Sequence, residues 1–331
     1  MAYTTIDNPE LFFQVKIWTG TGNSQALTLD GDEDMAPDYV AIKERSGTQQ
    51  WNVYDTIRGV QKYLGWNTTG QEATQSQGLT AFGSDGFTVG TDDMVNGNTK
   101  TYAGICWVES ATSGFDIVTF TGNQTARTIS HSLSAKPEWL WIKNREKVES
   151  WHMQHGALGA TQTAETNTAN AFGSGSTIWN DTEPTTSVFS VGNNGNINET
   201  GSDIITYLWA SKQGYSKFGK YTGNANANGP FIYLGFRPAM FIYKCSDTNG
   251  EEWKILDNKR DPFNRGSARN IILHANTAES DDTNSIGEFV SNGVKIRSAH
   301  NNINKSGSAF VYMAFAESPF VNSKKIPTNA R

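Results

Sequence analysis

Pro37-Asp-Tyr-Val-Ala-Ile-Lys43, Pro137-Glu-Trp-Leu-Trp-Ile-Lys143 and Pro238-Ala-Met-Phe-Ile-Tyr-Lys244 are three versions of one sequence element. Each is a proline followed by an apolar run that ends in lysine. The prolines lie 100 and 101 residues apart, and the lysine always falls six residues after the proline. A fixed period of this length indicates that one structural unit occurs three times in the chain.

Further landmarks keep the same order around this element. An aromatic-Thr-Gly-Asn element precedes each proline, as Phe120-Thr-Gly-Asn123, Tyr221-Thr-Gly-Asn224 and the longer Trp18-Thr-Gly-Thr-Gly-Asn23. A tryptophan follows each lysine, and an asparagine turn and an aromatic segment close each copy. The tryptophans are Trp51, Trp151 and Trp253, and the asparagines are Asn96, Asn198 and Asn304. We therefore predict copies at 1–112, 113–213 and 214–320, followed by an extended tail at 321–331. The first copy, which differs most at its ends, is a candidate anchoring copy.

The proline-led element predicts a central β-strand. Side chains alternate between the two faces of a strand, so Tyr39 and Ala41 should point opposite to Val40 and Ile42. Both faces are apolar, which suits a strand buried between layers. Proline is tolerated where a strand begins. With 32 Gly and many Asn, Thr and Ser in turn-like strings, the chain is predicted to be all-β. We expect three tandem β-sandwich-like repeats of about 100 residues, each with its own core.

Composition narrows the classes of partner. The net charge is −6 and the basic residues are scattered, which argues against nucleic-acid binding. No apolar run reaches the roughly 18 residues that a membrane-spanning helix needs. The start, Met1-Ala-Tyr-Thr-Thr-Ile-Asp7, lacks the pattern of a signal peptide. Only two cysteines, Cys106 and Cys245, are present, so we expect synthesis in a reducing cytoplasm and no disulfide framework.

Residues that recur in every copy are best explained by structure. We expect Trp51, Trp151 and Trp253 to fill the core and Pro37, Pro137 and Pro238 to open strands. The recurring lysines, Lys43, Lys143 and Lys244, are expected to be surface residues at strand ends.

Residues that do not recur are better candidates for contacts. Trp18, Trp66 and Trp179 are not required by packing common to all copies. The turns at 192–198 and 222–229 are rich in Asn and Gly and are expected to be exposed. The predicted binding residues are Asn193, Asn194, Asn196, Asn224, Asn226 and Trp179.

Two groups of residues resemble the beginnings of metal sites. Asp30, Asp32 and Asp34 have the alternate spacing of a calcium loop, but Met35 and Ala41 occupy positions where that pattern needs glycine and glutamate. His152 and His155 have ligand spacing without an evident third ligand. We therefore expect no metal and no other cofactor, with calcium at the three aspartates as the alternative.

Catalytic motifs are missing from the sequence. It contains no Gly-x-Ser-x-Gly elbow, phosphate-binding loop or dinucleotide fingerprint. Carboxylate pairs for glycoside cleavage meet only in the fold, so that chemistry stays open. The acidic residues nevertheless differ between copies, and the chain is predicted not to be an enzyme.

Several strings resemble a repeat domain of uncharacterised function that is found in tail-fibre and other virion proteins of tailed bacteriophages, notably those of marine bacteria and cyanobacteria. The similarity covers nearly the whole chain. It is carried by Asp116-Ile-Val-Thr-Phe-Thr-Gly-Asn123, Gly214-Tyr-Ser-Lys-Phe-Gly-Lys-Tyr-Thr-Gly-Asn224, Gly229-Pro-Phe-Ile-Tyr-Leu-Gly-Phe-Arg-Pro238, Ala316-Glu-Ser-Pro-Phe320 and the N-terminal heptapeptide. The resemblance implies a virion protein and supplies no catalytic residues.

Three functions follow as expectations. The first is a tail fibre or receptor-binding protein that contacts a host-surface glycan or protein. The second is a decoration protein that stabilises the head or tail, and the third is a polysaccharide depolymerase. Expected partners are other virion proteins and further copies of the chain, with a trimer favoured. The expected location is the virion, after synthesis in the host cytoplasm and release on lysis.

Overall fold

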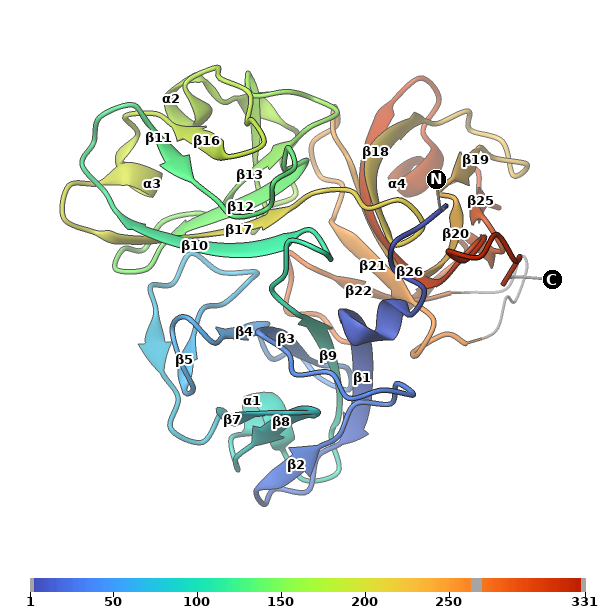
Figure 1. Ribbon diagram of the computed structural model, residues 1–331, viewed down its shortest axis with the longest axis horizontal. Coiled ribbons are helices and arrows are strands. Elements are labelled where there is room, and N and C mark those ends of the chain that lie inside the picture. Colours follow the sequence, from blue (N-terminus) through green and yellow to red (C-terminus); the bar gives the residue numbers. More distant parts are fainter. Residues whose placement is uncertain (1–2, 263–269, 329–331) are drawn as a thin grey trace.

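Antiparallel strands are the predominant regular structure of the computed structural model, which describes residues 3–262 and 270–328. The strands form three lobes that meet in the middle (Figure 1). The prediction of an all-β chain is confirmed. We call the lobes units 1, 2 and 3; their strands span 13–107, 115–209 and 216–319.

Unit 1 is the lower lobe of Figure 1. The short 3-10 helix η1 (Pro9–Leu11) precedes it. Its elements are β1 (Phe13–Thr19), β2 (Gln25–Leu27), β3 (Tyr39–Glu44), β4 (Asn52–Asp55), β5 (Lys62–Tyr63), β6 (Ala73–Thr74), β7 (Leu79–Gly83), β8 (Gly86–Val89), α1 (Asp93–Asn96) and β9 (Thr101–Trp107). The main sheet has the order β1-β9-β3-β4, and smaller sheets have the orders β2-β8-β7 and β5-β6.

Unit 2 is the upper left lobe. Its elements are β10 (Phe115–Thr121), β11 (Arg127–Ser130), β12 (Trp139–Asn144), β13 (His152–His155), β14 (Gln162–Glu165), β15 (Gly173–Ser174), α2 (Ser176–Trp179), β16 (Val188–Val191), α3 (Gly195–Asn198) and β17 (Asp203–Trp209). The main sheet has the order β10-β17-β12-β13-β14-β15, and β11 pairs with β16 in a second sheet.

Unit 3 is the upper right lobe. Its elements are β18 (Ser216–Thr222), β19 (Phe231–Tyr233), β20 (Phe236–Cys245), β21 (Lys254–Asp257), β22 (Asn270–His274), β23 (Asp282–Asn284), β24 (Gly287–Val290), β25 (Gly293–Ile296), α4 (Asn301–Asn304) and β26 (Ala309–Pro319). The main sheet has the order β18-β26-β20-β21-β22-β23, beside a sheet β19-β25-β24.

One strand order is common to the three main sheets. In each unit the first strand pairs with the last, the last pairs with the proline-led strand, and that strand pairs with the tryptophan-led strand. Tyr39 and Ala41 on β3 face the middle of the molecule, whereas Val40 and Ile42 face the small sheet of unit 1. The predicted assignment of these side chains to opposite faces is confirmed.

Each unit has a core of its own between its two sheets, as expected, and the three units also share a central core that was not expected. Its residues come from all three main sheets and include Trp107, Trp209 and Phe315. The Trp107 ring centroid lies 5.5 Å from that of Trp209 and 5.5 Å from that of Phe315. Each main sheet is apolar on both faces and its small sheet covers only one, so the second face must be covered by the other units.

Two predicted strand features differ from the structure. Pro238 does not open its strand but lies inside β20, where the pairing with β26 shifts register on both sides of it. A bulge of this kind accommodates the missing N–H. Residues 321–328 do not have the extended conformation that was predicted for the tail. Val321 bridges Pro327, and the Asn322 side chain accepts hydrogen bonds from the backbone of Lys324 and Ile326. Residues 329–331 of the predicted tail lie outside the described part.

The N-terminal segment completes the contact between units 1 and 3. The Phe13 ring stacks on Phe315 with centroids 4.8 Å apart. Asp7 accepts a hydrogen bond of 2.6 Å from the backbone N–H of Ser323, which joins the two ends of the chain. The three units therefore form a closed ring around the shared core.

An arm of each unit reaches the next unit at one equivalent place, just after the proline-led strand. The N–H of Glu72 donates to the Arg145 carbonyl at 2.7 Å, that of Phe172 to Ser246 at 2.9 Å, and that of Asp281 to Arg45 at 2.8 Å. These three contacts run in one direction around the ring. They hold the lobes together outside the core.

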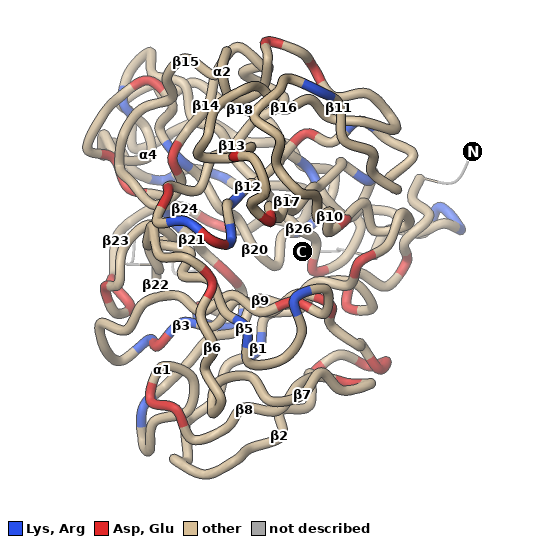
Figure 2. The backbone as a smooth tube through the Cα atoms, turned by 90° about the vertical axis from the view of Figure 1, so that its left-hand side faces the viewer, with Lys and Arg blue, Asp and Glu red and all other residues tan. Residues whose placement is uncertain are grey.

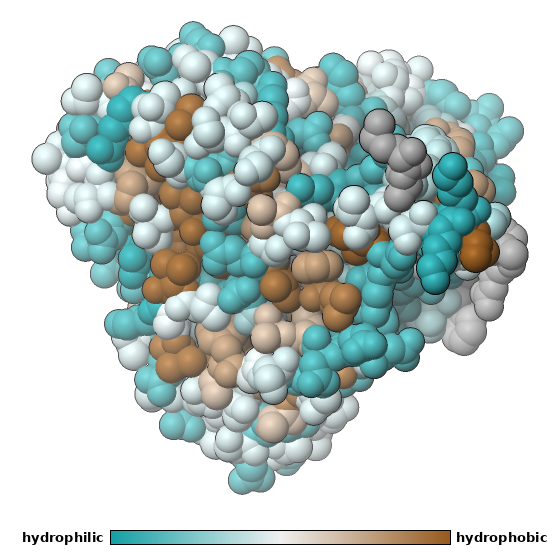
Figure 3. All heavy atoms as spheres, in the orientation of Figure 1, coloured by the Kyte–Doolittle hydropathy of each residue, from teal (hydrophilic) through white to brown (hydrophobic). Residues whose placement is uncertain are grey.

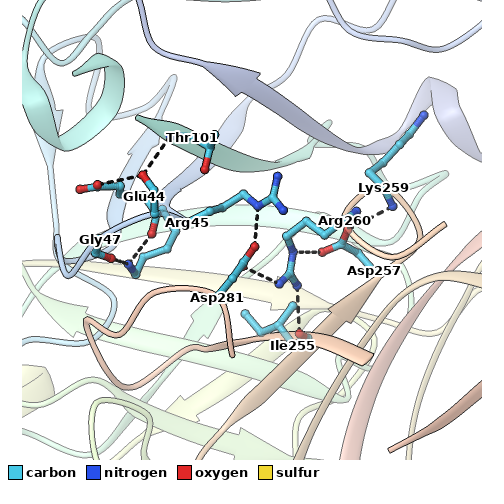
Figure 4. Close-up of polar contacts among 11 residues, drawn as sticks. Glu44, Arg45, Gly47, Thr101, Ile255, Asp257, Lys259, Arg260 and Asp281 are labelled. Carbon is cyan, nitrogen blue, oxygen red and sulfur yellow. Dashed lines mark hydrogen bonds and ion pairs between the residues drawn. The ribbon is translucent and has the colours of Figure 1, made fainter. Parts of the chain in front are cut away.

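Figure 4 shows how the arm of unit 3 is fastened to unit 1. The Arg45 Nε donates to Asp281 Oδ2 at 2.8 Å, and Asp281 Oδ1 accepts from Arg260 Nη1 at 3.2 Å. Arg260 Nε in turn donates to Asp257 Oδ2 at 2.5 Å. A chain of alternating charges therefore crosses this junction. At the junction of units 1 and 2, Arg145 pairs with Glu72 instead, at 2.9 Å.

The recurring lysines are buried, so the prediction that they lie on the surface is wrong. Lys43, Lys143 and Lys244 have no exposed area. Each ammonium donates to two backbone carbonyls, for example Lys143 to those of Asn144 and Lys147 at 2.8 and 2.9 Å. The loop after the strand folds over Lys43 and Lys143, whereas Ala169 of unit 2 supplies the second carbonyl to Lys244. A position at a strand end could not reveal either contact. Burial lowers the pKa of each lysine to about 8.

Candidate functional site

A groove of about 350 Å³ in unit 2 brings together two of the predicted binding residues. It lies beside the β13–β14–β15 edge of the main sheet and the turns that begin α2 and α3. We call it the unit 2 groove. Its polar lining residues include His152, Thr163, Glu165, Asn170, Ser174, Thr177, Asn194 and Asn196.

Asn194 and Asn196 are held at the rim by the start of α3. The Asn194 side-chain oxygen accepts from the N–H of Asn196 at 2.8 Å and caps this helix. Its Nδ2 donates to Thr177 Oγ1 at 3.3 Å, which ties the two turns together. Such caps are typical of Asn. Asn193 is exposed beside them but does not line the groove.

His152 lies at the inner side of the groove. It pairs with Glu165 across β13 and β14 and is 5% exposed. Neither ring nitrogen has a hydrogen-bond partner within the protein. Burial, and then the positive charge of Lys143, lower the pKa of His152 to about 4, so the ring is neutral at neutral pH. Units 1 and 3 carry Asn52 and Lys254 at this position.

The lining suits a ligand with many hydroxyl or amide groups. Asn side chains both donate and accept, and Ser and Thr hydroxyls do the same. Glu165 is the one carboxylate among the lining residues. The wall of the unit 2 groove therefore lacks the pair of acids that glycoside cleavage needs. The arrangement is that of a binding groove.

The second predicted turn lies in unit 3 and does not reach this groove. Asn224 and Asn226 are exposed. The Asn224 side-chain oxygen accepts from the Asn226 N–H at 3.0 Å, and that of Asn226 accepts from the Asn228 N–H at 2.8 Å. These side chains shape the turn.

A buried asparagine near the end of each unit makes hydrogen bonds to the turn that follows the first strand of that unit. The Asn304 side chain accepts from the Asn224 N–H at 2.7 Å and donates to the carbonyls of Asn226 and Ser298. Asn96 and Asn198 make the same three kinds of contact in units 1 and 2. This explains why a Thr-Gly-Asn element and a distant asparagine recur together.

Trp179 is fully buried, so its prediction as an exposed binding residue is wrong. It ends α2 and packs into the core of unit 2 between the sheets. Trp18 and Trp66, the other non-recurring candidates, are 8% and 1% exposed. Trp18 stacks on Tyr102, and Trp66 packs edge-on against Trp51. A tryptophan that one unit alone carries can still serve packing, because the three cores differ in shape.

The recurring tryptophans all lie in the shared core. Trp51, Trp151 and Trp253 are at most 1% exposed. The Trp51 indole donates to the His274 carbonyl of unit 3, and the Trp151 indole to the Gly65 carbonyl of unit 1, both at 2.8 Å. They therefore connect units as well as fill space. Pro37, Pro137 and Pro238 are buried too.

The fold brings together one group of acids that sequence reasoning missed. The carboxyl groups of Glu109 and Asp116 lie close together at the junction of units 1 and 2, and Asp38 accepts a hydrogen bond from the Glu109 N–H at 2.8 Å. Burial, and then Asp116, raise the pKa of Glu109 to about 7. At the equivalent positions of the next unit stand Ser211 and Lys217, so no repeated spacing marks the pair. It is not part of the unit 2 groove wall.

The acidic turn of unit 1 forms an ion pair. Asp30 contacts the Lys16 ammonium, and the backbone N–H of Met35 donates to Asp85. In the described ranges, no three His, Cys, Asp or Glu side chains are grouped as metal ligands. Within the same ranges no helix has the length and hydropathy to cross a membrane.

The surface of the three lobes is mixed in charge and mostly polar. Lys and Arg occur in all three units and are interspersed with Asp and Glu (Figure 2). The outer ends of the lobes are mainly hydrophilic or neutral on the face of Figure 3. Such a surface has no single sign that would attract a polyanion.

A family model described as a domain of unknown function (DUF7483) matches residues 8–319, which span all three units. No curated protein matches the sequence.

Proposed function

We propose that this chain, which belongs to the DUF7483 family of domains of unknown function, is a structural protein of a bacteriophage virion. It contacts the host cell surface, as a tail fibre or receptor-binding protein does. The ligand we propose is a surface glycan. The protein acts by binding and not by chemical conversion.

The unit 2 groove is the observation that carries this proposal. Its wall presents amide, hydroxyl, imidazole and carboxylate groups from several turns. The turns are anchored to a scaffold in which the shared core and the arm contacts fasten the units to one another. Binding residues on loops of a rigid β scaffold keep their geometry without a large ordering entropy on binding.

The assignment to a virion is supported by the resemblance of the sequence to phage virion proteins, which does not favour one place on the particle. A decoration protein of the head or tail is the second candidate. The closed ring of three units favours it, because a ring gives a broad body without an elongated shaft. A depolymerase finds less support, since the acid pair Glu109 and Asp116 lies outside the groove wall.

Binding of labelled full-length protein to candidate host cells and to their extracted polysaccharide tests the proposal. Released reducing sugar is assayed in the same samples. We expect saturable binding without sugar release. Asn196→Ala, in the groove wall, should weaken binding by about tenfold, equal to about 1.4 kcal/mol. Asn193→Ala, in the same turn but outside the wall, should leave binding unchanged.

Two results would contradict the proposal, each in a different way. No binding of the wild-type protein to any host preparation would reject host contact and favour the decoration protein, which should instead bind purified phage particles. Sugar release would reject a purely binding role. Light scattering on the purified chain would show whether it forms the proposed trimer.

A further inference from the structure

A second groove lies where units 2 and 3 meet, and its chemistry differs from that of the unit 2 groove. It has a volume of about 350 Å³. Its walls come from the start of the proline-led strand of unit 2, the first strand of unit 3, the end of β19 and the N-terminal segment. We call it the junction groove, and its principal residues are Tyr3, Glu138, Lys217, Phe218 and Tyr233.

Aromatic rings form one side of the junction groove. Tyr233 is 52% exposed, which is unusual for so large a side chain on a strand. The Tyr3 hydroxyl donates to the Gly235 carbonyl at 2.7 Å and lies beside Tyr233. Burial, and then Tyr233, raise the pKa of Tyr3 to about 12, so the hydroxyl keeps its proton at neutral pH. Buried Phe218 and Leu234 complete the apolar part of the wall.

Charged groups face this apolar part and balance each other. The Lys217 ammonium lies 5.3 Å from the centre of the Tyr233 ring and donates to the Tyr233 carbonyl at 2.7 Å. Glu138 accepts hydrogen bonds from the backbone and hydroxyl of Ser211. One positive and one negative group favour neither an anion nor a cation. They favour a neutral ligand that has hydroxyl groups along one side and an apolar face on the other.

The equivalent positions of the other units show that the fold does not require an aromatic residue at position 233. Leu27, Ile129 and Ile232 pair at corresponding places of the small sheets. The next residue is Thr28 in unit 1, Ser130 in unit 2 and Tyr233 in unit 3. Small polar residues therefore suffice at this exposed position. The large ring of unit 3 makes a contact that the scaffold itself does not use.

The charged residues of the groove are also particular to this junction. Lys217 corresponds to Asp116 of unit 2 and Gln14 of unit 1, at the second position of each first strand. The junction of units 1 and 2 is consequently acidic, with Asp38, Glu109 and Asp116 together. The balanced, aromatic junction groove is a departure from the repeated pattern, as a ligand site on a repeated scaffold would be.

We propose that the junction groove binds a neutral pyranose saccharide. The apolar C–H face of the sugar ring packs on the exposed face of Tyr233, and its hydroxyls bond to Lys217, Glu138 and the rim. The proposal deepens the function given above and rests on it only for the biological source of the saccharide. Binding of the sugar itself is testable without a host.

Saturation-transfer difference NMR on the full-length protein tests this site. The probes are maltose, cellobiose, lactose and N,N′-diacetylchitobiose, each added alone. We expect transfer to the ring protons of at least one of them. Tyr233→Ala should weaken that interaction by about tenfold, and Lys217→Met should weaken it as well, because it removes a hydrogen-bond donor beside the Tyr233 ring.

Phe231→Ala is the matched control. Phe231 is 47% exposed and belongs to the same strand, but it does not line the groove. It should leave saccharide binding unchanged, and melting curves should show that all three variants remain folded. Equal losses in Tyr233→Ala and Phe231→Ala would overturn the proposal, because binding would not depend on the groove. Absence of transfer to all four sugars would overturn it too.

The results separate this inference from the proposed function. Sugar binding that depends on Tyr233, together with no attachment to host cells, would retain the saccharide site and reject the host-contact role. Attachment to cells without binding of any of the four sugars, and unaffected by Tyr233→Ala, would retain that role and reject this site.

Discussion

Units 1 and 3 stabilise the turn after the tryptophan-led strand with a buried ion pair, whereas unit 2 uses a histidine. In unit 1, Arg58 Nε donates to Asp55 Oδ2 at 2.5 Å, and its Nη2 donates to the Val53 carbonyl at 2.8 Å. Arg260 and Asp257 repeat this geometry in unit 3.

In unit 2 the same place holds His155 and Leu158. The His155 Nδ1 accepts from the Ala157 N–H at 3.0 Å, and its Nε2 faces the Tyr312 carbonyl of unit 3 at 3.2 Å. Burial lowers the pKa of His155 to about 4, so the ring is neutral. The same turn is therefore stabilised by an ion pair in units 1 and 3 and by a neutral histidine in unit 2. This difference predicts how each unit responds to mutation and to pH.

The largest effect is expected from breaking one ion pair. Arg58→Leu leaves the Asp55 carboxylate buried without its guanidinium partner, and should lower the free energy of unfolding by about 3–5 kcal/mol. Guanidinium chloride unfolding followed by tryptophan fluorescence measures this. The double variant Asp55→His with Arg58→Leu copies unit 2 and should recover most of the loss. An equal loss in both variants would show that the buried charge is not the cause.

Acid should destabilise the protein through unit 2. The pKa values of His152 and His155 are lowered to about 4 in the folded chain, against about 6.5 when unfolded. Between these values the unfolded chain binds more protons, so stability is lost as the pH falls from about 6.5 to 4. Each histidine contributes at most about 3 kcal/mol.

Unfolding curves at several pH values measure this slope. His155→Gln, which does not titrate, should flatten it, and a slope unchanged in that variant would contradict the assignment. Glu109 acts in the opposite direction, because its raised pKa adds stability that is lost as the pH rises through about 7. Glu109→Gln should therefore steepen the acid loss.

A smaller difference is expected among the recurring tryptophans. The Trp151 indole donates to a carbonyl of the neighbouring unit, whereas the Trp253 indole has no hydrogen-bond partner within the protein. Trp151→Phe should therefore cost about 1 kcal/mol more than Trp253→Phe, the net value of one hydrogen bond. Paired unfolding measurements test this. Equal losses would show that packing alone determines the stability contributed by these side chains.

The proline-led strand shows how far periodicity can predict structure. Alternation along Tyr39–Ile42 identified both buried faces, because side-chain direction in a strand depends only on local geometry. The same reasoning failed for Lys43, Lys143 and Lys244. Their burial depends on segments outside the strand, which are the following loop for Lys43 and Lys143 and a segment of unit 2 for Lys244. The period of a strand does not encode such contacts.

Candidate sites were predicted only in part. The turn that carries Asn194 and Asn196 lines the unit 2 groove, since Asn- and Gly-rich turns lie at the surface. The exposure predicted for Trp179 was wrong, because a residue that occurs in only one of the units can still be buried there. Tyr233, Lys217 and Glu138 were not recognised together, since they are brought to one groove by the docking of units 2 and 3.

The sequence by itself determined the all-β class, the constant order of the repeated landmarks and the faces of the central strands, since these follow from local periodicity and turn chemistry. Only the tertiary structure decided that the units close into a ring around one core, that Glu109 meets Asp116, and that two grooves open on different parts of the surface. Those features depend on contacts between residues far apart in the chain, for which no local pattern exists.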